Sequence, residues 1–294
     1  MTGKNKICAL AVIAFVFAMA VCPCRALGGE CEPPPYQYAE TKQLMSLVEK
    51  AASLIRAGGE EVFPDFSRSG SPWLHDDQYV FVVDLHGNFI VHPFGNLQGR
   101  NQLHYKDSFG KPLVQWFIAK TSRGEGTDWC HYMWPKPYKK SASWKSAFIK
   151  KVEAPSGNRY IVGAGLYDMP IEKAFIVNAV NSAVAMIGEE GVMAFDKMRT
   201  KSSEFVFLNT YVFVIQADGT EVVNPYFPGR EGRNLLDLKN NGALEKMLSA
   251  LNNRQCAWVK TTLPKPAGHI FVTRESYVRK VKLGEKEYIV GCER

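Results

Sequence analysis

Eight residues in the first half of the chain have the side-chain types that a pocket for a small anion requires. An arginine presents a planar fork of donors to a carboxylate, and histidine and lysine add further donors. Aromatic residues supply apolar walls with polar tips. The candidates are Tyr79, Phe81, His92, Arg100, Trp116, Tyr132, Trp134 and Lys136. Together they predict a mostly apolar cavity with a few placed polar groups, which is typical of small-molecule sites.

Several candidates also have a purely structural interpretation. Arg100 could hold its loop to Asp107, and its repetition as Arg233 in the second half of the chain favours a structural role. His92, directly before a proline, could be a hydrogen-bonded histidine at the end of a strand. Lys136 could simply be solvated, and Tyr132 and Trp134 could be core residues. Both interpretations therefore stay open for these positions.

The elements that carry these residues occur twice in the sequence. QYVFVVDLHG at 78–87 returns as TYVFVIQADG at 210–219. In the same order, GRN at 99–101 returns at 232–234, PKP at 135–137 returns at 264–266, and YIVG at 160–163 returns at 288–291. Small insertions between fixed landmarks are typical of a duplicated domain. We predict two tandem domains of one fold, at residues 36–169 and 170–294.

Each copy reads as a helix, two strands, a segment with a further helix, and three more strands. Residues 38–57 place leucine, valine and isoleucine at helical spacing. A short second helix follows near residues 62–63, and residues 79–85 and 89–93 form strands joined by a turn. Residues 111–120 are expected to be helical. The order predicts an α+β fold, an antiparallel sheet of about five strands with helices packed on it.

The two copies differ in the proposed pocket. His92 is replaced by Asn224, Tyr132 by Thr261 and Trp134 by Leu263. Shared residues are explained by the shared fold, whereas residues present only in the first copy are better candidates for ligand contact. We therefore expect the first copy to bind a ligand. The second is expected to be mainly a scaffold or to bind something different. Its helix at 171–187 follows the last strand of the first copy directly, which predicts rigid coupling.

The ordered set YVFVVD, HP, GRN, WPKP and YIVGAGLYD resembles the Cache family of extracellular sensor domains, and most closely its second single-domain subtype. The resemblance is stronger over residues 36–169 than over 170–294. It implies a PAS-like fold with a long N-terminal helix, a central antiparallel sheet and a small-molecule pocket. Family members commonly precede chemoreceptors, histidine kinases or cyclases, and several bind small organic acids. No such output segment is found before Arg294.

The N-terminal residues predict export. Lys4 and Lys6 precede an apolar run from Ile7 to Val21, and small residues follow, as in a secretory signal peptide at residues 1–26. An uncleaved membrane anchor is the alternative. Four of the seven cysteines lie beyond this segment, and an even number in an exported chain allows disulfides. We expect Cys256 to pair with Cys292, at facing ends of neighbouring strands, which leaves Cys31 with Cys130.

The composition favours a globular binding protein. The chain is 46% hydrophobic and 22% charged, and its net charge of +7 includes three cations of the expected signal peptide. No dense basic run supports a nucleic-acid partner. No motif of catalysis, cofactor or metal binding is present, so we expect neither an enzyme nor a cofactor. The prediction is an exported sensor of a short organic acid that works with a membrane receptor or kinase. The alternative is a secreted or anchored interaction module.

Overall fold

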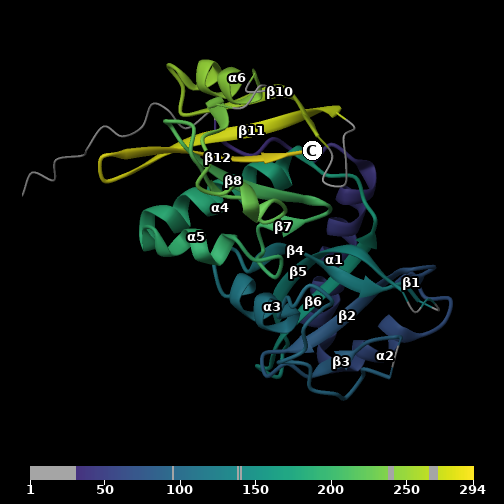
Figure 1. Ribbon diagram of the computed structural model, residues 1–294. Helices are drawn as coiled ribbons and strands as arrows, with labels where there is room; N and C mark the ends of the chain where they lie inside the picture. Colours follow the sequence, from purple (N-terminus) through teal and green to yellow (C-terminus); the bar gives the residue numbers. More distant parts are fainter. Residues whose placement is uncertain (1–30, 95, 138, 140, 238–241, 265–270) are drawn as a thin grey trace, which may run out of the picture.

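The computed structural model describes residues 31–94, 96–137, 139, 141–237, 242–264 and 271–294. Within them the chain forms two antiparallel sheets of six strands each. Figure 1 shows the sheets one above the other, with the green and yellow second sheet at the top. The expected signal peptide at residues 1–26 lies outside the described residues. The predicted α+β fold with an N-terminal helix and antiparallel sheets is confirmed.

The first half of the chain builds the lower sheet of Figure 1, with strand order β1-β2-β6-β5-β4 and β3 paired to β2. Its helical elements are α1 (Ala39–Gly58), η1 (Gly59–Val62), α2 (Phe63–Ser67) and α3 (Leu113–Thr121). Its strands are β1 (Leu74–His75), β2 (Gln78–Asp84), β3 (Phe89–Val91), β4 (Thr127–Pro135), β5 (Ala142–Glu153) and β6 (Arg159–Tyr167). The sequence pattern missed β1, because two residues are too few for an alternation to show.

The second half repeats this arrangement, with strand order β10-β11-β12-β8-β7 and β9 paired to β8. Its helical elements are α4 (Lys173–Glu190), α5 (Met193–Met198), η2 (Pro228–Arg230), η3 (Leu235–Asp237) and α6 (Gly242–Leu251). Its strands are β7 (Val206–Phe207), β8 (Thr210–Gln216), β9 (Glu221–Val223), β10 (Cys256–Pro264), β11 (Phe271–Leu283) and β12 (Lys286–Glu293). Each strand of the first sheet thus has a counterpart in the second.

Helices α1 and α4 each cover one face of a sheet. Leu44, Val48 and Ile55 recur at helical spacing on α1 and are fully buried, because this stripe faces the first sheet. Phe175 at the start of α4 packs on Trp129 of β4, with ring centroids 4.9 Å apart. Through such contacts the cores beneath α1 and α4 form one continuous hydrophobic cluster. The opposite face of the first sheet packs separately with α3.

The segment before α1 is held by a buried carboxylate at the start of the second half. Glu172 is fully buried, and its carboxylate accepts the backbone N–H groups of Gln37 at 2.7 Å and Tyr38 at 3.0 Å. The Tyr36 hydroxyl accepts a hydrogen bond from the indole N–H of Trp129 at 3.0 Å. The N-terminal segment therefore joins the two halves before the first helix begins.

Replacing Glu172 by alanine is expected to lower the free energy of unfolding by about 1–3 kcal/mol, because two backbone donors lose their acceptor. Glu172→Gln keeps the side-chain volume and one carbonyl acceptor, so its loss should be smaller. Urea denaturation of both variants measures the difference. Equal midpoints for wild type and Glu172→Ala would show that these bonds contribute nothing.

The disulfide prediction was wrong. The structure joins Cys31 to Cys256, with Cα atoms 5.9 Å apart, and leaves Cys130 and Cys292 as buried free thiols. Cys256 begins β10 and Cys292 lies in β12, but β11 runs between these two strands. Neighbouring strands are already about 4.8 Å apart, so strands two places apart exceed the separation that a disulfide allows.

Two lysines beside α3 fasten the first half to the second. Lys111 is fully buried and donates hydrogen bonds to the carbonyl oxygens of Val206 and His131, the latter at 3.3 Å. Lys120, in the last turn of α3, lies 2.9 Å from the carboxylate of Glu204. The helix above the first sheet is therefore linked at both ends to the segment that leads into β7.

The buried ammonium of Lys111 gives stability a distinct pH dependence. Burial lowers the pKa of Lys111 from 10.5 to about 8. The unfolded chain then binds more protons than the folded chain between these two values, so stability should rise with pH through this window. Across this window the free energy of unfolding of the wild type should rise by on the order of 3 kcal/mol more than that of Lys111→Met. Urea denaturation of both proteins at about pH 7.5 and about pH 10.5 tests this prediction. An equal change in the free energy of unfolding between the two pH values for wild type and variant would contradict it.

Candidate functional site

The candidate site is a small cavity between the first sheet and α3. Its volume is about 10 Å³, roughly that of one water-sized sphere. The lining comes from β2, β3, β4, β5, the first half of α3 and the residue after β3. The lining residues are Tyr79, Phe81, Phe89, His92, Leu113, Phe117, Tyr132, Trp134 and Lys145. The cavity thus contains five of the eight residues proposed from the sequence.

Strand alternation explains why these five lie together. Tyr79 and Phe81 occupy alternate positions of β2 and therefore point to the α3 face, whereas Val80 points to the α1 face. Tyr132 and Trp134 alternate in the same way on β4. At the cavity the Tyr132 ring centroid lies 5.7 Å from that of Phe117 and 6.0 Å from that of Trp134, within the usual range for aromatic pairs.

Lys145 is the only charged side chain among those that line the cavity. It is 1% exposed, and its ammonium nitrogen lies 3.6 Å from the Tyr79 ring centroid and 5.0 Å from that of Tyr167. No hydrogen bond or ion pair joins this nitrogen to another described residue. Burial holds the pKa of Lys145 well below its usual value, opposed only by the charge of Asp77. The site therefore contains a buried lysine nitrogen without an ion-pair partner among the described residues, and its charged form is costly unless an anion pairs with it.

His92 closes another side of the cavity as a neutral ring. Burial, followed by the charge of Lys145, lowers the pKa of His92 to about 4. Its Nδ1 lies 2.5 Å from the carbonyl oxygen of Phe94, so this nitrogen is committed to the backbone and only Nε2 remains for another partner. The ring packs edge-on against Tyr79 at 5.0 Å. His92 thus combines the strand-end role and the wall role considered from the sequence.

Two tyrosines of the cavity stay protonated at neutral pH. Burial raises the pKa of Tyr79 to about 12, and burial also raises the pKa of Tyr132 well above its usual value. Both hydroxyl groups therefore keep a proton that can be donated to an anion.

Arg100 lies outside the cavity. Its side chain is exposed, while its backbone pairs with that of Phe89 beside β3. The expected link from Arg100 to Asp107 is also absent among the described contacts. Instead, the Asp107 carboxylate accepts the backbone N–H groups of Phe109, Lys111 and Met133. The anion contact expected from Arg100 is thus not in place, and Lys145 occupies the position of the cation.

Trp116 and Lys136 also lie outside the cavity. Trp116 is on the side of α3 that faces the second half, where its ring centroid is 5.3 Å from the Lys111 nitrogen. Lys136 pairs with Asp168 at 2.9 Å, beyond the end of β4. The direction of a loop or helix side chain depends on packing that the sequence pattern does not specify, so these two residues did not join the others at this cavity.

The sequence analysis missed Lys145 because the pattern SAFIKKVE predicts a strand that begins at Ser146, one residue after it. One signal was present. Lys145 shares the parity of the buried Ala147 and Ile149, and a lysine on a buried face is unusual. Recognising that face required the pairing of β5 with β6, which places Lys145 opposite Tyr167.

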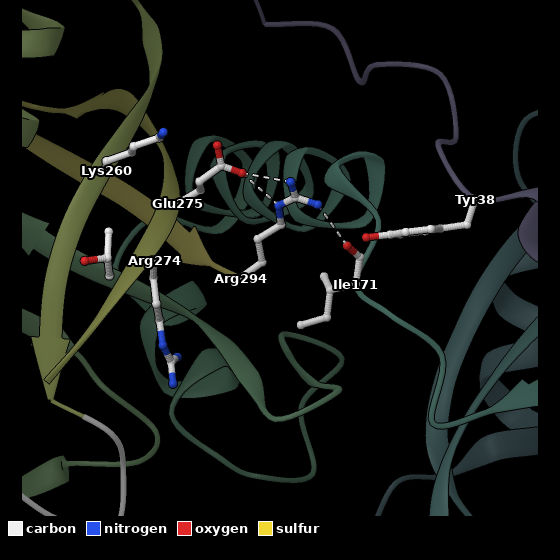
Figure 2. Close-up of a pocket in the computed structure, with 7 residues that line it drawn as sticks. Tyr38, Ile171, Lys260, Arg274, Glu275 and Arg294 are labelled. Carbon is white, nitrogen blue, oxygen red and sulfur yellow. Dashed lines mark hydrogen bonds and ion pairs between the residues drawn. The ribbon is translucent and has the colours of Figure 1, made fainter. Parts of the chain in front are cut away.

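A larger groove of about 570 Å³ lies beside the junction of the two halves and is shown in Figure 2. It is wide open, and most of its charges are already paired. Arg294 donates to the Glu275 carboxylate at 2.8 Å and to the Ile171 carbonyl oxygen at 3.3 Å. Arg274 pairs with Glu293 at 2.5 Å. We therefore place the candidate site at the smaller cavity, where the buried Lys145 has no ion-pair partner among the described residues.

Comparison with known proteins identifies the family. The family model dCache_2, described as Cache domain, matches residues 65–291, which is most of the chain. This chain belongs to the Cache domain family. The resemblance seen in the sequence motifs is thereby confirmed, while the subtype stays a prediction.

Individual proteins that are similar to this chain share a third or less of the aligned residues in the examples that follow. The curated "Sensor histidine kinase MctS" of Rhizobium johnstonii is 33% identical over 92 residues, covering 31% of this chain and 19% of that protein. This chain therefore matches about a fifth of the length of that relative. A structure described as "Structural basis for carboxylic acid recognition by a Cache chemosensory domain" is 23% identical, with a TM-score of 0.37, over 44% of this chain and 93% of that one. The ligand-binding domain of the Pseudomonas fluorescens chemoreceptor CtaA with L-leucine is 13% identical, with a TM-score of 0.34, over 86% and 85%.

Two kinds of feature are absent from the part of the chain that the structure describes. No helix among them is long and apolar enough to cross a membrane. Likewise, within the ranges that the structure describes, no group of three or more histidine, cysteine, aspartate or glutamate side chains is arranged to hold a metal ion.

Proposed function

We propose that this chain is a sensor unit that binds a short monocarboxylate in the cavity above the first sheet. The observation that carries the proposal is Lys145, a buried ammonium without a counterion in an aromatic cavity. A buried cation is strongly disfavoured unless an anion pairs with it. A ligand carboxylate would supply that charge, and we expect the Tyr79 and Tyr132 hydroxyls to donate hydrogen bonds to it.

The cavity size and walls limit the ligand to a few carbon atoms. A volume of about 10 Å³ is too small for a whole acid, so Leu113 and Phe117 of α3 must move outward on binding. The aromatic rings exclude water from the apolar end of the ligand. A ligand of about five heavy atoms gains at most about 7 kcal/mol, so the dissociation constant should be micromolar or weaker.

Binding should be coupled to proton uptake. A carboxylate beside Lys145 favours its charged form and raises the pKa of its ammonium toward the usual value. Between the pKa values of the free and the liganded protein, each bound anion therefore brings a proton with it. Calorimetric titrations in buffers of different ionisation enthalpy would reveal this uptake.

The chain organisation proposed from the sequence accords with the structure. We propose two tandem Cache domains at residues 36–169 and 170–294, in view of two sheets with matching strand order. The Cys31–Cys256 disulfide supports an extracytoplasmic location, where such bonds persist. The matched curated relative is a sensor kinase, which accords with sensing. A receptor or kinase partner for this chain stays a prediction.

The testing experiment is a thermal-shift screen of the protein against short monocarboxylates, amino acids and amines. We expect acids to raise the midpoint, by about 5 °C at a hundredfold excess over the dissociation constant. Arg100→Ala should keep this response, because its side chain lies outside the cavity. A protein that responds to no acid would contradict the proposal and favour a module that docks on a protein partner.

A further inference from the structure

The matching registers of the two sheets identify the counterpart of the cavity in the second half. Ala147 of β5 pairs with Gly165 of β6, and Ser276 of β11 pairs with Glu293 of β12. These pairs align Glu293 with Gly165. By the same registers, Tyr132 and its partner Lys145 correspond to Thr261 and its partner Arg274. The sheet position that holds Lys145 therefore holds Arg274 in the second half.

The counterpart positions contain carboxylates where the first sheet has none. Glu293 takes the place of Gly165, and Glu221 takes the place of Phe89. Phe89 and Glu221 correspond because each is the residue that pairs directly after the bulge, with β2 in the first sheet and with β8 in the second. Glu293 contacts the Arg274 guanidinium at 2.5 Å, and its side chain is 7% exposed. In Figure 2 the Arg274 guanidinium lies apart from the Glu275–Arg294 pair.

A second arginine completes the charge balance of this cluster. Arg230 lies 2.9 Å from the Glu221 carboxylate, whose side chain is 3% exposed. The second half thus has two cations facing two buried carboxylates. The cavity of the first half has one cation and no carboxylate among its lining residues.

The space beside the cation differs between the two sheets at the position of Gly165 and Glu293. A Cβ atom at Gly165 would lie 2.5 Å from Cε of Lys145, so the lysine chain fills the space that a side chain would need. At the equivalent place, Glu293 projects its own carboxylate to the cation. In the first sheet the anion would be a free ligand, whereas in the second sheet it is the carboxylate of the Glu293 side chain.

We propose that the second sheet contains a carboxylate-binding site that is permanently occupied by the Glu293 side chain. Arg274 is its cation, and the class of ligand that fits once Glu293 is removed is a small monocarboxylate. This site lies in the second sheet and does not depend on binding in the first. The competing interpretation is an ordinary structural ion pair, which leaves no room for a free anion.

The test removes the attached carboxylate and supplies a free one. Glu293→Gly reproduces the residue found at Gly165, and a Lys145→Met background removes any response of the first cavity. We expect its thermal midpoint to fall by about 5 °C or more, because Arg274 loses its counterion. Sodium acetate should restore the midpoint in a saturable way, whereas sodium chloride of equal ionic strength should not.

Glu293→Gln is the matched control. Its neutral amide fills the same space, so the midpoint should fall without any recovery that is specific to acetate. If the Glu293→Gly protein does not fold, the Glu293→Ala variant is used in its place. Refolding of that variant on addition of acetate, followed by circular dichroism, then gives the readout. Acetate that stabilises the Gly or Ala variant no more than the Gln variant would overturn the proposal. Failure of Lys145→Met to alter wild-type binding would instead count only against the first-sheet site.

Discussion

Lys145→Met is expected to make the free protein more stable while abolishing its response to carboxylates. Lys145 is 1% exposed and has no ion-pair partner among the described residues, so methionine of similar length removes a desolvation cost. We expect a gain of about 1–3 kcal/mol in the free energy of unfolding at neutral pH. Thermal unfolding with and without an effective acid measures both effects.

The gain should depend on pH in a defined direction. Because the pKa of Lys145 is lowered in the folded state, the unfolded chain binds more protons between the folded pKa and 10.5. The wild type therefore loses the most stability from burying the Lys145 ammonium at pH values below the pKa of the folded state. It loses none at pH values above 10.5. The advantage of Lys145→Met should shrink as the pH rises toward that value.

Lys150→Met provides a matched control on the same strand. Lys150 lies on the opposite face of β5 and pairs with Glu49 of α1 at 2.6 Å. Removing this partly exposed ion pair should cost less than about 1 kcal/mol and leave carboxylate binding intact. A Lys145→Met protein that is less stable than wild type, or that still binds, would contradict the role proposed for Lys145.

Breaking the Cys31–Cys256 disulfide is expected to have the second large effect. The bond joins residues 225 positions apart, so it restricts the unfolded chain strongly. Cys31→Ser should lower the free energy of unfolding by about 2–5 kcal/mol. A reducing agent should lower the wild-type midpoint to that of the variant.

The variant itself supplies the control for the reductant. The other cysteines that the structure describes, Cys130, Cys256 and Cys292, have no disulfide partner in this variant, so reductant should leave its midpoint unchanged. The polar anchors of the N-terminal segment persist in this variant, including the bond from Asn181 to the Cys31 carbonyl oxygen at 3.0 Å. A wild type whose midpoint does not respond to reductant would show that the bond is absent in solution.

The sequence was sufficient where a residue lies on a regular strand. Tyr79 and Phe81 share one face because side chains alternate, and Tyr132 and Trp134 follow the same rule on β4. The repeat identified which strands correspond, so the face could be chosen without coordinates. Those residues are therefore found together at the cavity.

Other features depend on contacts that no local pattern contains. Arg100 has the right chemistry, but its loop directs the side chain to solvent. Lys145 enters the site through the pairing of β5 with β6, and this pairing also required Gly165 to lack a side chain. The Cys31 pairing depends on the path of the segment before α1, which crosses to the second half first.

The N-terminal segment and the last strand meet at one place on the surface. The Arg294 guanidinium lies 3.4 Å from the Gln37 side-chain oxygen and also contacts the Ile171 carbonyl oxygen. The two ends of the segment from residue 37 to residue 294 therefore lie close to each other. Such a unit could be inserted into a surface loop of a fluorescent protein without separating the ends of that loop. Ligand-dependent changes in the brightness of such a fusion would make the Cache unit a transplantable optical reporter.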